Sequence, residues 1–191
     1  GAGRIDGYCV GEPWNTAAVA KGVGRIVTTK AAIWRSSPEK VLGVAAAWAA
    51  RDSEILSALL RAFYRAAEWC GVPANHVELA RLLAAPAYVD CPAEWLLPAL
   101  SGSIDAGKGE TVNVADFFVP HAKAATFPWK SHALWFYSQM VRWGQVSSSE
   151  GNEAIARGTY RPDLYRAALG DLGVALPGAN SKVEGALRSE M

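Results

Sequence analysis

The chain has 191 residues, of which 51% are hydrophobic and 19% are charged, a composition that excludes an intrinsically disordered protein. Its 19 basic and 18 acidic residues leave a formal net charge of +1 without a basic run, so the sequence carries no signature of nucleic-acid binding. Uncharged stretches such as residues 41–50 and 131–141 are far shorter than the about 20 residues of a bilayer-spanning helix, and none in the sequence is longer than 131–141.

The first elements alternate in type. Residues 5–10 are rich in β-branched and aromatic side chains and end at Gly11, which predicts a strand. Pro13 suits the first helical position, and the predicted helix continues over residues 14–21 until the glycines that follow. Residues 25–29 predict a second strand, with Lys30 just past its end. A strand, helix and strand in this order predict an α/β arrangement.

Helices dominate the rest of the chain. After a third predicted strand over residues 39–44, helical patterns cover residues 53–70, 75–84, 92–100, 128–143, 150–157 and 162–169. In the first of these helices an apolar stripe is formed by Ile55, Leu56, Leu59, Leu60, Phe63, Ala67 and Cys70. Residues 101–110 predict a polar, glycine-rich loop. From residue 176 we expect a tail that docks Leu176 and Pro177 at most.

The sequence lacks the motifs of common enzymes, including the nucleophile elbow, the P-loop, the dinucleotide fingerprint and the zinc-protease helix. We therefore expect no catalytic residues and no cofactor. The three cysteines, which we expect to be buried and at least one of them free, are Cys9, Cys70 and Cys91. The three histidines, which lack carboxylate pairs at ligand spacing and predict no metal site, are His76, His121 and His132.

Two elements have the chemistry for a ligand. The turn over residues 11–15 places a helix N-terminus beside Glu12, Pro13 and Trp14, and helix N-termini favour anions. Lys30 follows a neighbouring predicted strand, and ligands collect outside the carboxyl ends of strands in open α/β sheets. A small oxyanion between the turn and Lys30 is therefore reasonable. The alternatives are that Lys30 is an ordinary exposed lysine and that Trp14 is a packing residue.

Several segments together resemble the solute-binding proteins of nitrate and bicarbonate ABC importers. The segments, which span residues 3 to 187, are GYCVGEPWN at 7–15, VTT at 27–29, IW at 33–34, PEKVLG at 38–43, WC at 69–70, PAN at 73–75, ELARLL at 78–83 and FPWKSHALW at 127–135. The resemblance implies a bilobal periplasmic-binding-protein fold of type II that closes on a small anion.

The resemblance also implies that this chain is the incomplete, helix-rich C-terminal portion of such a protein. Residues 1–38 would be the end of the second lobe, and residues 39–191 the hinge return with helices that pack on the first lobe. The apolar stripes of residues 53–70 and 128–143 would then lose part of the sheet they cover. We expect the chain alone to self-associate or to cluster its helices, and to bind nitrate weakly if at all.

Within that family the resemblance implies that Lys30, Glu12, Pro13 and Trp14 bind the ligand, with Lys30 separating nitrate from bicarbonate binders. A lysine suits a monoanion directly, whereas a carboxylate at this position would need a metal ion to bridge it to the substrate. The expectation is nitrate or nitrite without a metal. Glu12 has a second interpretation, in which it orients Lys30 or another neighbour instead of touching the anion.

Two functions remain open at this point. The first is the solute-binding component of an ABC importer, periplasmic or anchored to the outer face of the inner membrane, with permease subunits as partners. Its contact with a membrane would run only through an anchor or permease outside this chain. The alternative is a cytoplasmic nitrate sensor of the same fold that sequesters an RNA-binding antiterminator. Neither function involves catalysis or direct contact with nucleic acid.

Overall fold

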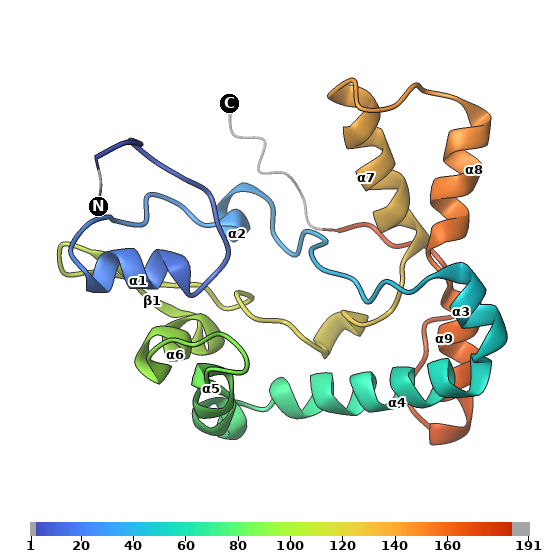
Figure 1. Ribbon diagram of the computed structural model, residues 1–191, viewed down its shortest axis with the longest axis horizontal. Coiled ribbons are helices and arrows are strands. Elements are labelled where there is room, and N and C mark those ends of the chain that lie inside the picture. The colour runs from blue at the N-terminus through green and yellow to red at the C-terminus, as the bar shows by residue number, and fades with distance from the viewer. Residues whose placement is uncertain (1–2, 185–191) are drawn as a thin grey trace. The chain divides into compact units, whose positions relative to one another are not determined.

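Two hydrophobic clusters organise the structure, a computed structural model that describes residues 3–184 (Figure 1). Each cluster belongs to one of two units of the chain. The first unit consists of residues 3–37 and 68–120, and the second of residues 38–67 and 121–184. The longest helix, α4 (Ser53–Cys70), contributes residues to both units. Within residues 3–184, no helix combines the length and the apolar character needed to span a membrane.

The first unit is built around the packing of two short helices. Its elements are α1 (Trp14–Ala20), α2 (Lys30–Ile33), η1 (Pro73–Asn75), α5 (His76–Ala84), α6 (Ala93–Ser101), β1 (Ser103–Gly107) and β2 (Glu110–Asn113). The cluster between α5 and α6 is formed by Leu79, Ala80, Cys91, Leu96 and Leu100. The helices α5 and α6 were predicted from their apolar spacing, and the structure confirms both within one residue at each end.

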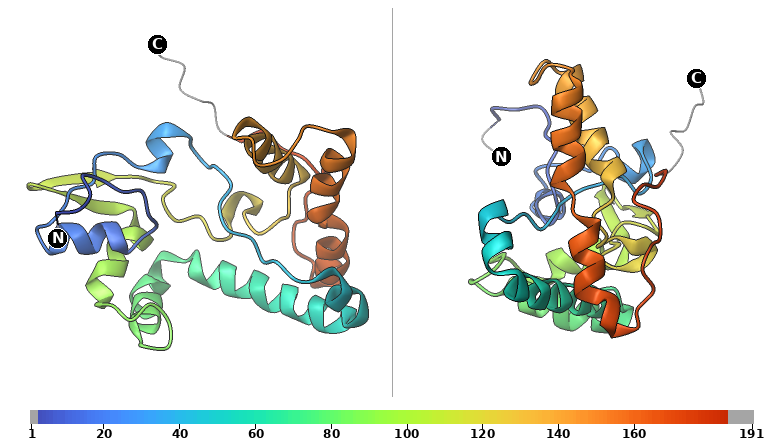
Figure 2. Two further views of the ribbon diagram at one scale, coloured as in Figure 1. Left: turned by 45° about the horizontal axis from the view of Figure 1, so that its top comes forward. Right: turned by 90° about the vertical axis from the view of Figure 1, so that its right-hand side faces the viewer.

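The prediction of a loop over residues 101–110 is wrong. Here β1 and β2 form an antiparallel hairpin, which α1 contacts (Figure 2). In β1 the side chains of Ile104 and Ala106 are 1% and 4% exposed, while those of Ser103 and Asp105 face solvent. This alternation is the period of a half-buried strand, and the polar residues between the apolar ones conceal it in so short a segment.

The three predicted strands at residues 5–10, 25–29 and 39–44 are also wrong. These segments have no strand assignment, because among residues 3–184 they find no neighbouring strand with which to form a ladder. A single bond, from the Ile26 amide to the Ala106 carbonyl at 3.0 Å, joins one of them to the hairpin. Their apolar side chains stay exposed, as in Ile5, Val27 and Val41 at 70%, 78% and 62%.

Gly102 provides a test of the junction between α6 and the hairpin. It ends α6 with a φ of +74°, and a Cβ at this position would collide with the Val114 carbonyl oxygen. We expect Gly102→Ala to lower the free energy of unfolding by more than about 2 kcal/mol, since left-handed strain and a backbone clash add together. Gly109→Ala is the control, because Gly109 has a similar φ of +77° but a Cβ there would meet no atom within 4 Å. Urea unfolding should show a loss of about 1 kcal/mol for the control, and equal losses would contradict the clash.

The second unit buries aromatic side chains between helices. Its elements, apart from its share of α4, are α3 (Ala46–Arg51), η2 (Ala122–Ala124), α7 (Lys130–Arg142), α8 (Glu150–Thr159), α9 (Pro162–Leu169) and η3 (Gly170–Leu172). The cluster consists of Tyr64, Phe127, Trp129, Tyr165 and Leu169. The helices α7 and α8 lie side by side (Figure 1), and the Ser149 hydroxyl caps α8 by accepting the Asn152 amide at 3.1 Å.

Several details of the second unit differ from the sequence prediction. The helix α7 begins at Lys130, two residues after Pro128, because the extended residue Trp129 is its N-cap. Trp143 at the end of α7 is 72% exposed and takes no part in the core. The tail docks much more than Leu176 and Pro177, since Asn180, Lys182 and Glu184 also form hydrogen bonds to this unit.

The apolar stripe of α4 is only partly buried. Leu56 and Ala67 are covered, whereas Ile55, Leu59 and Phe63 are 60%, 39% and 43% exposed. The three exposed side chains follow one another at intervals of four residues and therefore share one face of the helix. This exposure supports the expectation of an apolar face in need of a partner, and self-association stays a prediction.

All three cysteines are free, where the sequence predicted at least one, and they are not all buried. Cys91 is buried and Cys70 is partly buried in the first unit, whereas Cys9 is exposed in the segment before α1. Burial raises the pKa of the Cys91 thiol, and the charges of Asp90 and Glu94 raise it further. Cys91 is therefore a small apolar core residue, as the sequence suggests.

Candidate anion-binding site

The turn that opens α1 is held by its own side chains. The Asn15 side-chain amide donates to the Val10 carbonyl at 2.9 Å, and the Tyr8 hydroxyl donates to the Trp14 carbonyl at 3.4 Å. These bonds join the extended segment before the turn to the first residues of the helix. Because the segment lacks a strand ladder, such side-chain bonds do the positioning that a sheet would otherwise do.

Glu12 has a specific structural role in this turn. Its Oε2 atom accepts hydrogen bonds from the Thr16 amide at 3.1 Å and the Thr16 hydroxyl at 2.8 Å. A carboxylate in this position satisfies a helix amide that lacks an intrahelical partner and also complements the helix dipole. Glu12 therefore already occupies part of the α1 N-terminus, where the sequence placed free amides for an anion.

Pro13 and Trp14 follow Glu12 directly and differ in exposure. Pro13 is buried, and it is the N-cap of α1, whereas the sequence predicted it at the first helical position. The Ala17 amide donates to the Pro13 carbonyl at 2.8 Å. The peptide bond between Glu12 and Pro13 is cis. The first helical residue, Trp14, is 52% exposed. The buried proline and the capping carboxylate thus fix the helix start and present the indole at the surface.

Lys30 occupies the first position of α2 instead of following a strand. Its carbonyl accepts the Trp34 amide at 2.8 Å, while its side chain is exposed. Within residues 3–184 the Lys30 ammonium forms no hydrogen bond or ion pair, and none joins Lys30 to the turn of Glu12, Pro13 and Trp14. Both elements belong to the first unit. The structure thus assembles the turn itself, and it leaves Lys30 as a separate exposed cation.

The histidines have structural partners. His121 lies edge-on to Tyr64 with ring centroids 4.8 Å apart, and His76 lies edge-on to Phe118 at 6.1 Å. The Nε2 atom of His132 lies 2.7 Å from the Glu184 carboxylate. Across the part of the chain that the structure describes, no three histidine, cysteine or acidic side chains gather as metal ligands would.

Sequence reasoning missed the residues that support the turn. Thr16 binds Glu12 four positions earlier in the chain, and Tyr8 anchors the carbonyl of Trp14. The available signal was the presence of a hydroxyl residue in the first turn of a helix that follows a carboxylate.

Comparison with known proteins identifies this architecture. A family model described as the NMT1-like family matches residues 1–84. The chain is similar to a crystal structure of the periplasmic nitrate-binding protein NrtA from Synechocystis PCC 6803, with a TM-score of 0.86 and 32% sequence identity, over 91% of this chain and 46% of that one. The fold is therefore a helix-rich part of a periplasmic-binding-protein fold.

Two curated relatives extend the comparison. The nitrate/nitrite binding protein NrtA of Synechococcus elongatus is 37% identical over 172 residues, which make up 90% of this chain and 39% of that protein. The bicarbonate transport ATP-binding protein CmpC of the same species is 34% identical over 177 residues, or 91% of this chain and 25% of that protein. The chain belongs to the NMT1-like family that includes the NrtA nitrate-binding proteins, and it spans well under half the length of these relatives.

Proposed function

We propose that the chain contributes to binding a small oxyanion, nitrate or nitrite, within the solute-binding component of an ABC importer. The observation that carries this proposal is an exposed Lys30 side chain without a partner among residues 3–184, in a chain similar to a nitrate/nitrite binding protein. An ammonium group that is not neutralised by the protein itself can neutralise a monovalent anion, and the product of that pairing carries no net charge.

The two candidate elements favour nitrate over bicarbonate held through a metal ion, since a lysine at position 30 pairs directly with a monoanion. Calcium is bound by carboxylate, carbonyl and water oxygens, and one carboxylate oxygen of Glu12, Oε2, already accepts bonds from the Thr16 amide and hydroxyl. In this proposal Glu12 and Pro13 fix the first turn of α1, and Trp14 contributes an exposed apolar side chain to the anion site. Permease subunits of the importer are the proposed partners, with a periplasmic or membrane-anchored location.

A second candidate function follows from the similarity to the bicarbonate transport ATP-binding protein CmpC. In that case the chain is a binding domain joined to an ATP-binding subunit, and its location is cytoplasmic. The sensor that sequesters an antiterminator shares this cytoplasmic location and stays a separate prediction. The ligand chemistry of Lys30 is the same in each case.

Titration of the isotope-labelled 191-residue chain with sodium nitrate, followed by NMR, tests the ligand. We expect Lys30 and the turn of residues 11–15 to shift with nitrate at millimolar concentrations, because the chain spans less than half of its binding-protein relatives and supplies only some of the anion's partners. Sodium chloride at the same ionic strength is the control for charge screening. Shifts that are identical with both salts would refute the proposal, and a response to bicarbonate only with calcium would indicate the other substrate.

A further inference from the structure

The last described segment of the chain, residues 177–184, forms a strap across the start of α7 in the second unit. Two sets of polar contacts hold this strap, and they differ in chemistry. The first set holds residues 177–180 and the second holds residues 182–184. The difference between the two sets is the basis of the inference.

The first set depends on the guanidinium of Arg166 in α9. Its nitrogens donate to the carbonyls of Pro177 at 2.8 Å and Ala179 at 2.9 Å, to the carbonyl of Gly178 at 3.3 Å, and to the side-chain oxygen of Asn180 at 2.8 Å. The Lys130 amide at the start of α7 adds a bond to the Asn180 carbonyl at 2.8 Å. None of these donors changes its charge between pH 5 and 8, because arginine and backbone amides do not titrate there.

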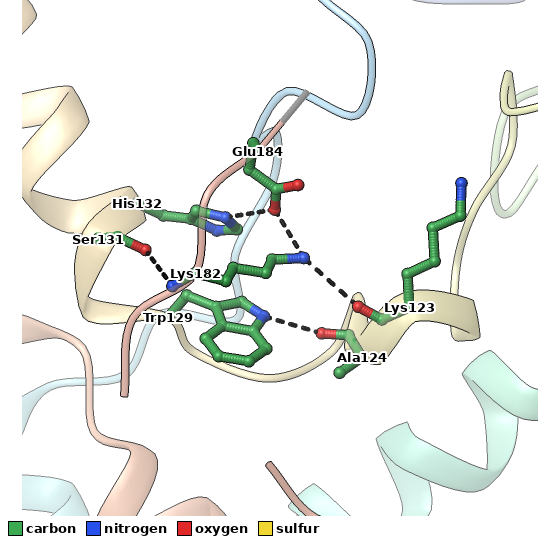
Figure 3. A network of polar contacts seen from close by, with 7 residues as sticks. All are labelled: Lys123, Ala124, Trp129, Ser131, His132, Lys182 and Glu184. Carbon is green, nitrogen blue, oxygen red and sulfur yellow. Dashed lines mark hydrogen bonds and ion pairs between the residues drawn. The ribbon is translucent and has the colours of Figure 1, made fainter. Parts of the chain in front are cut away.

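The second set converges on a single carboxylate oxygen (Figure 3). The Oε1 atom of Glu184 lies 2.7 Å from His132 Nε2 and 2.6 Å from Lys182 Nζ. All three side chains are largely covered, with 12%, 16% and 23% of the Glu184, His132 and Lys182 side chains exposed.

Further contacts fix Lys182 in this set. Its backbone amide donates to the Ser131 hydroxyl at 3.1 Å, and its ammonium donates to the Lys123 carbonyl at 3.3 Å. The ammonium also lies 5.0 Å from the centre of the Trp129 ring. These contacts hold the charge of Lys182 over the core while the strap is in the position that the structure shows.

The charge balance of this cluster depends on His132. With a neutral imidazole, the Glu184 carboxylate and the Lys182 ammonium cancel. A proton on His132 places a second cation against the same carboxylate oxygen in a poorly hydrated site. We propose that His132, Glu184 and Lys182 form a pH-operated latch that releases residues 181–184 on acidification, while Arg166 keeps residues 177–180 in place.

The groups around His132 support release of the strap at low pH rather than at high pH. Burial is the largest influence on the pKa of His132 and lowers it. The hydrogen bond and the charge of Glu184 raise this pKa, and the charge of Lys182 lowers it. The net result is a pKa below the usual value of 6.5. Both charged partners belong to the strap itself. From the other elements, η2 presents the Lys123 carbonyl, α7 presents the Ser131 hydroxyl and the Lys130 amide, and α9 presents Arg166, which bonds to residues 177–180.

The sign follows from the lowered pKa. In the open latch His132 has its ordinary pKa, so the open form binds a proton more readily than the closed form. The closed latch is therefore fully favoured above pH 6.5 and loses its advantage as the pH falls from 6.5 through the lower pKa of the closed form. At a pH below the His132 pKa of both forms, the equilibrium ratio of closed to open latch is lower than its value above pH 6.5. The ratio is about tenfold lower for each unit of difference between the two pKa values.

Hydrogen exchange resolved by residue, measured by NMR on the 191-residue chain, tests the latch. The Lys182 amide, which donates to Ser131, reports on the latch, and the Lys130 amide, which donates to Asn180, reports on the Arg166 region. Between about pH 7.5 and about pH 5 we expect protection of the Lys182 amide to fall by more than about twofold after correction for intrinsic exchange. Protection of the Lys130 amide should stay within about twofold.

Two pairs of variants assign the effect. His132→Gln keeps a side-chain donor but cannot titrate, so protection of Lys182 should no longer depend on pH, whereas His121→Gln in the same unit should respond like the parent chain. Glu184→Gln removes the negative charge beside His132 and Lys182 and should open the latch at both pH values. Glu153→Gln breaks only an exposed ion pair with Arg157 and should leave the latch closed at the higher pH, as in the parent chain.

Three results would overturn the proposal. The first is Lys182 protection that does not change with pH. The second is a pH response that persists in His132→Gln. The third is a joint loss of protection at Lys130 and Lys182, which would show unfolding of the whole strap instead of release at the latch. If a variant does not fold, NMR titration of His132 in the parent chain decides the question, because a pKa at or above 6.5 contradicts the latch.

Discussion

Replacing Lys30 with glutamate is expected to abolish the nitrate-specific NMR shifts of the chain. The substitution removes the cation that neutralises the anion and puts a like charge in its place, so nitrate would have to approach a carboxylate. In the presence of calcium the same variant is expected to gain a response to bicarbonate, since the new carboxylate provides a ligand for a bridging metal ion. The measurement is a nitrate titration against chloride, repeated with bicarbonate and calcium.

Lys108→Glu is the matched control for this prediction. Lys108 lies exposed in the tip of the hairpin in the same unit, and its substitution changes the net charge by the same amount. We expect this control to leave the nitrate response within about twofold of the parent chain, because an exposed charge outside the proposed site is screened by solvent and salt. Equal losses in both variants would show a general effect of charge, and an unchanged response in Lys30→Glu would show that Lys30 is an ordinary surface lysine.

The helices of this protein follow closely from its sequence, and the strands do not. The helix α4 has the predicted bounds, because its apolar spacing extends over five turns and ends at Gly71. The hairpin of β1 and β2 was missed because only Ile104 and Ala106 mark its buried face. The strands predicted at residues 5–10 and 25–29 have suitable side chains, but a strand also requires a neighbour, which no local pattern can supply.

The candidate site shows the same division between local and distant contacts. The turn at residues 11–15 was found from its motif, and the bonds from Thr16 to Glu12 and from Asn15 to Val10 span at most five positions. The cluster of His132, Lys182 and Glu184 joins residues separated by about fifty positions. Three isolated side chains in a sequence give no sign of such a contact, which is why the sequence assigns His132 to no site.

The largest stability effect is expected from Phe127→Ala in the second unit. Phe127 is 2% exposed and packs edge-on against Trp129 and Tyr165, with ring centroids 4.6 and 5.3 Å away. Removing its ring leaves a cavity between two aromatic side chains that are themselves fixed, so the site cannot collapse easily. We expect a loss of about 3–5 kcal/mol in the free energy of unfolding, measured by urea denaturation and tryptophan fluorescence.

Phe136→Ala is the control for this core, and it also corrects an expectation from the sequence. The pattern of α7 alone predicts a loss of about 3–5 kcal/mol for Phe136, but its side chain is only half-buried, so the expected loss falls to about 1–2 kcal/mol. Similar losses in the two variants would contradict the assignment of Phe127 to the centre of the core.

The two units also allow the core and the ligand site to be tested separately. Phe127 belongs to the second unit, and Lys30 belongs to the first. The folded fraction of Phe127→Ala should therefore retain the nitrate-specific shifts of Lys30 and of residues 11–15. If the variant were instead stable but gave no nitrate response, Phe127 would be part of a functional surface and its burial would not be the reason for its presence.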